Sequence, residues 1–198
     1  MAGNNTSEIR VAGTGRILVG SVGSPAPTDF GQVDWGQGWT DLGYTSADGV
    51  TFSKKDKLDP IDTWQAVSPV RFIYSDRDLT LKFALLQFNA DTLPLFLGGG
   101  KVGPADSSGS SDGAYSYDIA DGPQADEHAL GLEFTDGTAI TYRFVIPRGQ
   151  VTASDDLKLA RKAAVQLGVT FTALNNGTDP LATFVMKDPV YAGSNPAA

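Results

Sequence analysis

Residues 129–146 read ALGLEFTDGTAITYRFVI, and this stretch decides the fold class. Apolar side chains alternate with small or polar ones over residues 130–135, and the alternation resumes over residues 140–146. Asp136 and Gly137 lie between the two runs. Asp-Gly between alternating runs is the strongest short-range signal for a β-hairpin, so two antiparallel strands are predicted here.

A wider β pattern surrounds this hairpin. The chain has 23 Gly and 11 Pro among 198 residues, and this density of turn formers favours many short strands over long helices. A short apolar strand is expected over residues 16–22. A second hairpin is expected from the extended runs 64–74 and 78–88, with its turn at residues 75–78. In the second run four apolar side chains share one face: Leu79, Leu81, Phe83 and Leu85.

Residues 154–174 combine two patterns. Residues 154–156 resemble a helix start and good helix formers follow, but over residues 163–174 the side chains alternate without a break. This two-residue period of the side chains predicts a strand over residues 163–174, with residues 157–162 as its extension.

One short α-helix is expected at about residues 90–97. Asn89 precedes it as N-cap, and the three glycines 98–100 end it. Residues 98–101, GGGK, lack the Gly-Lys-Ser/Thr ending of a phosphate loop, so a helix stop is the preferred interpretation. The Ser- and Gly-rich segment 103–113 is expected to be disordered in an isolated domain, and to be held by neighbouring chains in an assembly.

Composition excludes several kinds of site. The chain has no cysteine and one histidine, which removes disulfides, thiolate nucleophiles and Cys- or His-rich metal clusters. The net charge of -8 argues against a surface that clamps phosphates. No run approaches the ~18–20 apolar residues needed to cross a bilayer, and residues 1–6 have no secretory signal. A soluble single domain that folds in a cytoplasm is expected.

A group of acidic residues and the single histidine allow a catalytic hypothesis. Asp48, Asp56, Asp59 and Asp62 lie close in sequence, and a carboxylate pair could act as general acid and base. Turn and surface carboxylates are the preferred interpretation, because Asp commonly supplies turn hydrogen bonds. The lone His128 is expected to be a surface residue.

The tryptophans allow a hypothesis of carbohydrate binding. Trp35, Trp39 and Trp64 could form a sugar-stacking platform in a lectin-like sandwich. Ordinary core and interface aromatics are the preferred interpretation.

Several motifs follow one another along residues 10–100. They are AGTGRILV at 12–19, PAPTD at 25–29, WTDLGY at 39–44, SADGV at 46–50, DTWQ at 62–65, RDLTLKF at 77–83 and the FN of 88–89 before the short helix that ends in GGG at 98–100. In this order they resemble the major tail protein, or tail tube protein, of long non-contractile-tailed bacteriophages, especially those of actinobacterial hosts. The second half is similar only in its alternating strands.

The resemblance implies a mostly β subunit, a β-sandwich or partial barrel with one short helix and long extended loops or arms. It implies a single domain over residues 1–198, with an N-terminal arm at about 1–10, an inter-subunit loop at about 38–60 and a C-terminal tail at about 189–198. Six subunits would form a ring, and stacked rings would form the tube that conducts the genome during ejection. No catalysis, cofactor or metal is implied.

The resemblance also implies partners and location. The chain would assemble with itself, with a tape-measure protein, a tail terminator and distal tail proteins. DNA would pass through the lumen without specific binding, and no membrane is involved. The protein would lie in the virion tail, after assembly in the host cytoplasm. The alternative is a virion or surface β-sandwich module that binds carbohydrate or protein, such as an adhesin or decoration protein.

Residues 38–60 are expected to be an arm that reaches another subunit. Trp39, Leu42 and Tyr44 would be its apolar anchors, and residues 54–57 would meet acidic partners. The 64–88 and 129–146 hairpins would pair with neighbours into one inner barrel. The candidate interface residues are Trp39, Asp41, Leu42, Tyr44, Asp48, Lys54, Lys55, Lys57, Trp64, Arg71 and Arg77.

Overall fold

A computed structural model describes residues 3–31, 35–105, 113–177 and 179–192, and it confirms the mostly β fold class with one short α-helix. The strands are β1 (Thr14–Ser21), β2 (Trp39–Asp41), β3 (Thr45–Thr63), β4 (Ala66–Leu85), β5 (Gly103–Pro104), β6 (Tyr115–Ser116), β7 (Glu127–Asp136), β8 (Ile140–Ser154), β9 (Leu167–Ala173) and β10 (Thr183–Lys187). The helices are η1 (Thr6–Glu8), α1 (Thr92–Leu97) and η2 (Pro189–Tyr191).

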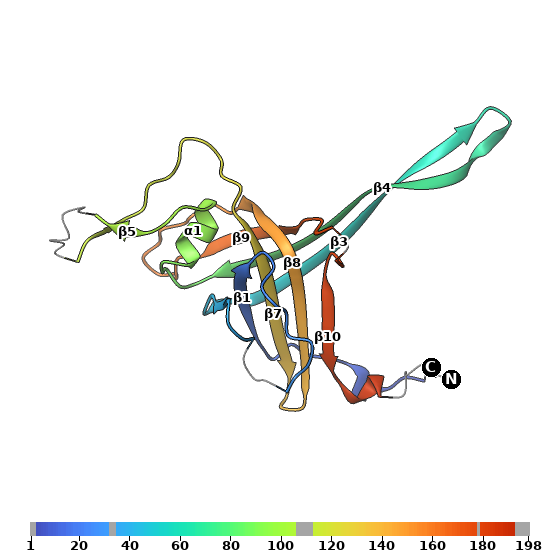
Figure 1. The fold of residues 1–198 in the computed structure, drawn as a ribbon. Coiled ribbons are helices and arrows are strands. Elements are labelled where there is room, and N and C mark those ends of the chain that lie inside the picture. The colour runs from blue at the N-terminus through green and yellow to red at the C-terminus, as the bar shows by residue number, and fades with distance from the viewer. Residues whose placement is uncertain (1–2, 32–34, 106–112, 178, 193–198) are drawn as a thin grey trace.

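Eight of these strands form one antiparallel sheet in the order β2-β1-β7-β8-β9-β4-β3, with β10 on β8. The long strand β8 belongs to both halves of this sheet, because residues 141–145 pair with β10 and residues 149–154 pair with β9. Figure 1 shows β1, β7 and β8 running across β9, β4 and β3. The sheet therefore folds over on itself and encloses a core between its two halves.

The core takes apolar side chains from both halves of the sheet. Alternation places these side chains on one face of each strand, and complete burial of each large one stabilises the fold by roughly 1.5–3 kcal/mol. The most deeply buried are Ile17, Leu42, Leu81, Leu85, Leu130, Phe144, Ile146, Leu167, Val169 and Phe171.

Two predicted strand features are confirmed. The 129–146 hairpin is β7–β8, and Gly137 in its turn has φ +64°. The strand predicted at 16–22 is β1.

The hairpin predicted from residues 64–74 and 78–88 is wrong. β4 is continuous from residue 66 to residue 85 and pairs with β3, and the turn lies at Trp64 and Gln65. The turn-like residues 75–78 lie instead at a bulge, where Lys57 pairs with Asp76 while Leu58 pairs with Tyr74. Ser75 is the extra residue of this bulge. The four predicted face-sharing residues Leu79, Leu81, Phe83 and Leu85 are all buried.

Residues 38–60 are consequently not a loop. They contain β2 and most of β3. The first of these residues belong to β2, which pairs with β1, and those from residue 45 onward lie along one strand of the long β3–β4 hairpin.

The strand predicted at 163–174 is confirmed only from residue 167 to residue 173, and its extension over 157–162 is wrong. Residues 155–166 form a connection outside the strands. Ala163 and Ala164 are exposed, and alanine gains little from the packed surface of a sheet. The alternating pattern of these small residues is therefore not sufficient to extend β9 toward residue 163.

Helix α1 confirms the predicted helix and begins two residues later than expected. The N-cap residue is Asp91, not the predicted Asn89. Asn89 Oδ1 still accepts hydrogen bonds from the backbone N–H groups of Asp91 and Thr92, at 2.9 and 2.8 Å. Gly98 ends the helix with φ +86°, as the helix-stop interpretation predicts. α1 packs against β8 and β9, and Leu95 and Phe96 are buried. Of the Ser/Gly-rich segment 103–113, residues 106–112 lie outside the described residues.

The segments with η1 and η2, near the start and the end of the described chain, lie close together (Figure 1). Within the described part of the chain, no helix has the length and apolar character needed to cross a membrane.

Candidate assembly surface

The most prominent surface feature is the far end of the β3–β4 hairpin, which projects from the body (Figure 1). Residues 54–78 form this projection and are here called the arm. β4 pairs with β9 only over residues 80–85, and β3 pairs with β4 alone in the described structure. The arm is therefore a two-stranded ribbon with solvent on both faces.

One face of the arm continues the core-facing side of the hairpin. Directly opposed residues of an antiparallel pair share a face, and the pairs Phe52 with Leu81 and Lys54 with Leu79 lie on the core side. Beyond them the same face carries Leu58 with Tyr74 and Pro60 with Phe72. The exposed large apolar residues of the arm are Leu58, Ile61, Trp64, Val67, Val70, Phe72, Ile73 and Tyr74.

A charged cluster separates this apolar surface from the core. Asp56 accepts hydrogen bonds from Arg77 Nε at 2.7 Å and from Lys54 Nζ at 2.5 Å. The hydrogen bond from Arg77, followed by that from Lys54, lowers the pKa of Asp56 below its ordinary value. The pKa of Arg77 is raised by the same contact with Asp56. The cluster stays ionised at neutral pH and marks the base of the arm.

A second assembly feature is the unpaired edge of β3. Over its whole length, β3 has a backbone partner on one side only among the described residues. Residues 151–154 of β8 likewise pair only with β9, because the pairing with β7 ends at Gln150. Unpaired strand edges recruit further strands, so each copy offers two edges of the same half-sheet.

The 129–146 hairpin lacks such an edge. β7 lies between β1 and β8, and residues 141–145 of β8 lie between β7 and β10. The hypothesis that this hairpin pairs with neighbouring subunits is therefore wrong along its paired length, while the β3 edge remains open.

The side of this half-sheet that faces away from the core is rich in hydroxyl groups. Ser53, Thr80 and Thr172 lie in one row across β3, β4 and β9, and Thr51, Lys82 and Thr170 form the next. These residues form the hydroxyl face. Short hydroxyl side chains leave the surface flat and polar.

Comparison with known proteins identifies the kind of assembly. A family model described as phage tail tube protein matches residues 1–197. The chain belongs to this family. A search of curated proteins gives no match to the chain. The predicted resemblance is confirmed at the level of the family, and the expected actinobacteriophage type stays a prediction.

Membership in the tail tube protein family gives the chain a structural role in the tail of a phage virion. The family is one of structural proteins rather than of enzymes. The long hairpin and the open strand edge are features that self-assembly would use.

The predicted interface residues fall into three groups in this tail tube protein. Lys54, Lys55, Lys57, Trp64, Arg71 and Arg77 lie on the arm. Asp41, at the end of β2, and Tyr44 and Asp48, around the start of β3, are exposed on the body, and Tyr44 has 77% of its surface accessible. Trp39 is half-buried and donates its indole N–H to the Pro25 carbonyl at 2.9 Å.

Leu42 is the exception, because it lies inside its own subunit. Its exposure is 0%, and it packs in the main core. Its expected role as a surface anchor is wrong for this conformation. The exposed Phe72 and Tyr74 were not predicted, because their alternation is the same as that of a buried strand.

Arg10, near the start of the chain, and η2, near its end, are held together by a buried carboxylate. Asp188 accepts hydrogen bonds from Arg10 Nε at 2.6 Å, from Arg10 Nη2 at 2.8 Å and from the Tyr142 hydroxyl at 2.5 Å. The Arg10 hydrogen bond is the main cause that holds the pKa of Asp188 well below its ordinary value. Burial, followed by the bond to Asp188, raises the pKa of Tyr142 to about 12. This terminal clamp fixes residue 10 and η2 to β8.

A second, partly buried ion cluster holds the Trp35 side chain. Glu133 accepts from Arg16 Nε at 2.9 Å, Arg143 Nε at 2.6 Å and Trp35 Nε1 at 3.2 Å. Burial acts to raise the pKa of Glu133, but the bonds from Arg143 and Arg16 outweigh it and lower the pKa. The Trp35 ring covers Gly131, where a Cβ atom would lie 2.2 Å from it.

The acidic residues and the histidine do not come together into a catalytic or metal-binding site. Asp56 is held by its two cationic partners, and Asp48, Asp59 and Asp62 are spread along β3. No group of metal-binding side chains occurs among the described residues. His128 lies at the start of β7, 2.9 Å from Asp126.

The three tryptophans do not form one platform. Trp35 is buried and packs edge-to-face on Trp39 at 5.0 Å, while Trp64 is at the tip of the arm and 98% exposed.

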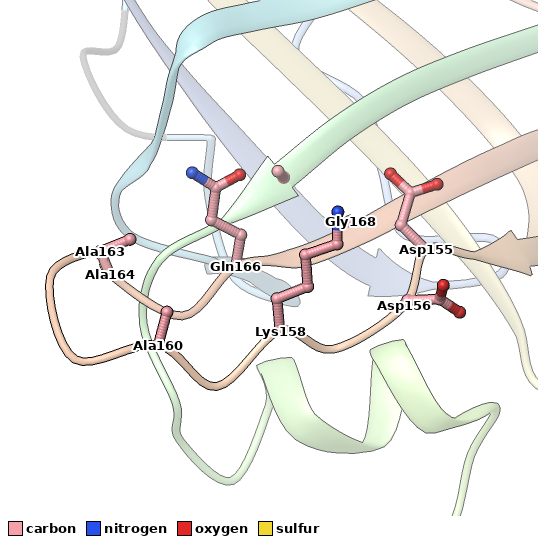
Figure 2. Close-up of a pocket in the computed structure, with 9 residues that line it drawn as sticks. Asp155, Asp156, Lys158, Ala160, Ala163, Ala164, Gln166 and Gly168 are labelled. Carbon is pink, nitrogen blue, oxygen red and sulfur yellow. The ribbon is translucent and has the colours of Figure 1, made fainter.

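A cavity of about 550 Å³ is lined mainly by the connection between β8 and β9 (Figure 2). Asp155 and Asp156 line it, but Asp155 pairs with Lys82 at 2.9 Å. Most of the remaining lining consists of Ala84, Ala160, Ala163, Ala164 and Gly168. The lining is therefore mostly alanine and glycine, with two carboxylates and no convergent set of catalytic groups.

Proposed function

We propose that this tail tube protein forms six-membered rings that stack into a hollow tube, and that the phage genome passes through its lumen during ejection. The observation that carries the proposal is the combination of an open β3 edge with a projecting apolar arm in one member of the family. The two features are suited to different contacts.

The open edges favour a ring. The β3 edge and the edge of β8 at residues 151–154 lie on opposite sides of one half-sheet. Pairing of one edge with the other edge of the next copy is a head-to-tail contact, and such a contact closes into a ring when the rotation fits. Closure also removes the exposed edges that would otherwise recruit unrelated strands.

The hydroxyl face is the surface that we assign to the lumen. It lies on the half-sheet that carries both open edges, so ring closure would make it one continuous inner wall. Its hydroxyl groups alternate with charges of both signs, such as Lys82 and Asp78. A wall of this kind offers no dense array of cations to hold DNA phosphates.

Net charge supports weak interaction with DNA. Each copy carries -8, so a ring of six would carry about -48 and repel phosphates wherever acidic groups face the lumen. Screening confines this effect to charges within about 8 Å at physiological salt. A strongly positive lumen in the assembled tube would contradict this account.

The expected partners follow from the same role. Assembly in the host cytoplasm would involve a tape-measure protein, a tail terminator and distal tail proteins. A separate adhesin or decoration role gains no support from the described residues, because the tryptophans do not converge.

Removal of the arm tests the proposal. We expect the purified chain to form rings or tubes in negative-stain electron microscopy. In the test variant, residues 58–75 are replaced by Asn-Gly between Lys57 and Asp76, which are paired in the native hairpin. A two-residue Asn-Gly turn suits such a pair. The variant should unfold at nearly the native temperature and remain a monomer.

The matched control keeps the arm and changes an exposed polar residue, Ser68→Ala. It should assemble like the native protein. Full-length tubes from the armless variant would contradict the role of the arm, and discrete native monomers that bind glycans would favour the adhesin alternative.

A further inference from the structure

The body contains an open apolar groove at the seam between the two halves of the sheet. It has a volume of about 470 Å³ and is lined by side chains from β1, β3, β7, β8 and β10, among them Ile17, Val50, Phe52, Phe134, Phe144 and Phe184. We call this the aromatic groove.

Three of the rings form a half-exposed cluster. Phe52 and Phe184 flank Phe144, with ring centroids 5.1 and 4.4 Å from it. Phe144 is buried, whereas Phe52 is 44% and Phe184 is 48% exposed. Water therefore covers apolar surface at the mouth of the groove, and an apolar side chain placed there would displace it favourably.

We infer that the aromatic groove of one copy receives the arm tip of a second copy, with Trp64 as the inserted side chain. This inference deepens the proposed function and rests on it, because it names the contact between copies within the tube.

Geometry makes the contact intermolecular. The arm points away from the body (Figure 1), so its tip does not lie near the groove of its own chain. Trp64 is 98% exposed and the neighbouring Val67 is fully exposed. A buried aromatic side chain removes roughly 150–250 Å² from water. The tip and the groove thus have complementary apolar surface in different places on the same chain.

The separation of tip and groove also decides the type of assembly. A projection on one site and its receptor on another give a heterologous contact, which continues from copy to copy instead of closing as a two-fold dimer. A tube needs a contact of this type along its axis.

Charge permits the approach. The arm is neutral, whereas the whole chain carries -8. The arm can therefore enter the acidic body of another copy with little like-charge repulsion. Its charged residues are Lys54, Lys55, Lys57, Arg71 and Arg77 against Asp56, Asp59, Asp62, Asp76 and Asp78.

Cysteine cross-linking tests the contact, because the chain has no native cysteine. One population carries Gln65→Cys beside Trp64. The other, distinguished by a size tag, carries Ala47→Cys on the exposed rim of the groove. The matched control carries Ala160→Cys, an exposed alanine on the loop that lines the cavity of Figure 2. The populations are mixed, assembled and treated with a short bis-maleimide.

We expect the dominant mixed product from Gln65→Cys with Ala47→Cys, and little from Gln65→Cys with Ala160→Cys. Equal yields from the two pairs would overturn the inference. A higher yield from Ile9→Cys with Ala47→Cys would also overturn it, because the exposed Ile9 would then show that a terminal segment occupies the groove.

Truncation supplies an independent measurement. Trp64→Ala should raise the protein concentration needed for assembly by about 30-fold or more, as for a Trp at the centre of an interface. Phe184→Ala should have a similar effect, and the double variant should be little worse than either single one, because the residues share a contact. Additive effects would overturn the contact.

The outcomes separate the two proposals. Native tubes without the Gln65–Ala47 product would refute the groove contact and leave the tube function intact. Failure of the native chain to assemble under any condition would refute the proposed function, and the groove contact with it.

Discussion

The two halves of the β3–β4 hairpin have the same backbone pairing and opposite environments. Near the body, β4 also pairs with β9, and Leu81 and Phe83 are almost completely buried. In the arm, Phe72 and Tyr74 continue the same face with 56% and 69% of their surface exposed. The apolar pattern is similar in both halves, so the presence of a packed partner layer makes the difference. An isolated two-stranded hairpin is at best marginally stable, and in the proposed assembly another copy supplies the layer that the arm lacks.

The largest expected effect comes from a change in the buried half. Leu81→Ala should lower the free energy of unfolding by about 2–5 kcal/mol, because it removes buried methyl groups and leaves a cavity. Leu81 is 1% exposed in the main core. Chemical denaturation followed by fluorescence or circular dichroism measures the loss.

The matched change in the arm is Phe72→Ala. Because Phe72 is more than half exposed, its truncation should change the unfolding free energy by no more than about 0.5 kcal/mol, while tube formation is lost or strongly reduced. Equal destabilisation by the two substitutions would mean that the arm is packed in the monomer, and the comparison would fail.

The sequence predicted the buried half of the molecule better than the exposed half. Asp136 and Gly137 form a real turn between alternating runs, so local chemistry was sufficient for β7 and β8. Residues 75–78 carry similar turn-forming side chains but lie at a bulge, because the true partner strand lies earlier in the chain. Local composition does not distinguish a bulge from a turn when the partner is unknown.

The same reason limits prediction of the assembly surface. The lysines at 54–57 were placed on a projecting segment and lie on one, whereas Trp64 was expected in a hairpin of the inner barrel and lies at the tip of the arm. Leu42 was assigned to the surface and is in the core. Leu42 and Phe72 are both apolar residues of extended segments. Their environments depend on which other strand lies above them, and one-dimensional alternation carries no such information.

A smaller effect on stability should come from the terminal clamp, which lies in the body and not in the arm. Its contribution to stability should depend on pH. The folded-state pKa of Asp188 is depressed, chiefly by Arg10. A depressed carboxyl pKa contributes stability above the unfolded pKa of about 3.9, and that contribution is lost as the pH falls through the folded value. Asp188→Asn should therefore lower the melting temperature at pH 7, and the difference from the native protein should shrink on acidification below about pH 4. A difference that stays constant down to strongly acidic pH would show that the clamp contributes through packing alone.

The smallest effect on the monomer should come from the charged cluster at the base of the arm. Asp56→Asn removes the partner of Arg77 and Lys54, whose side chains are 58% and 49% exposed. Exposed ion pairs contribute little to stability and are screened by salt, so the unfolding transition should hardly move. The cluster nevertheless lies where the buried half of the hairpin becomes the exposed half, and Asp56 joins both strands through Arg77, one pair before the Lys57–Asp76 pair at the bulge. We therefore expect Asp56→Asn to weaken tube assembly at low salt more than at high salt, measured by sedimentation of tubes across a salt series, with Asp59→Asn on the same arm as control. If Asp56→Asn destabilises the monomer as strongly as Leu81→Ala, the cluster belongs to the buried half, and the boundary between the two halves lies further out along the arm.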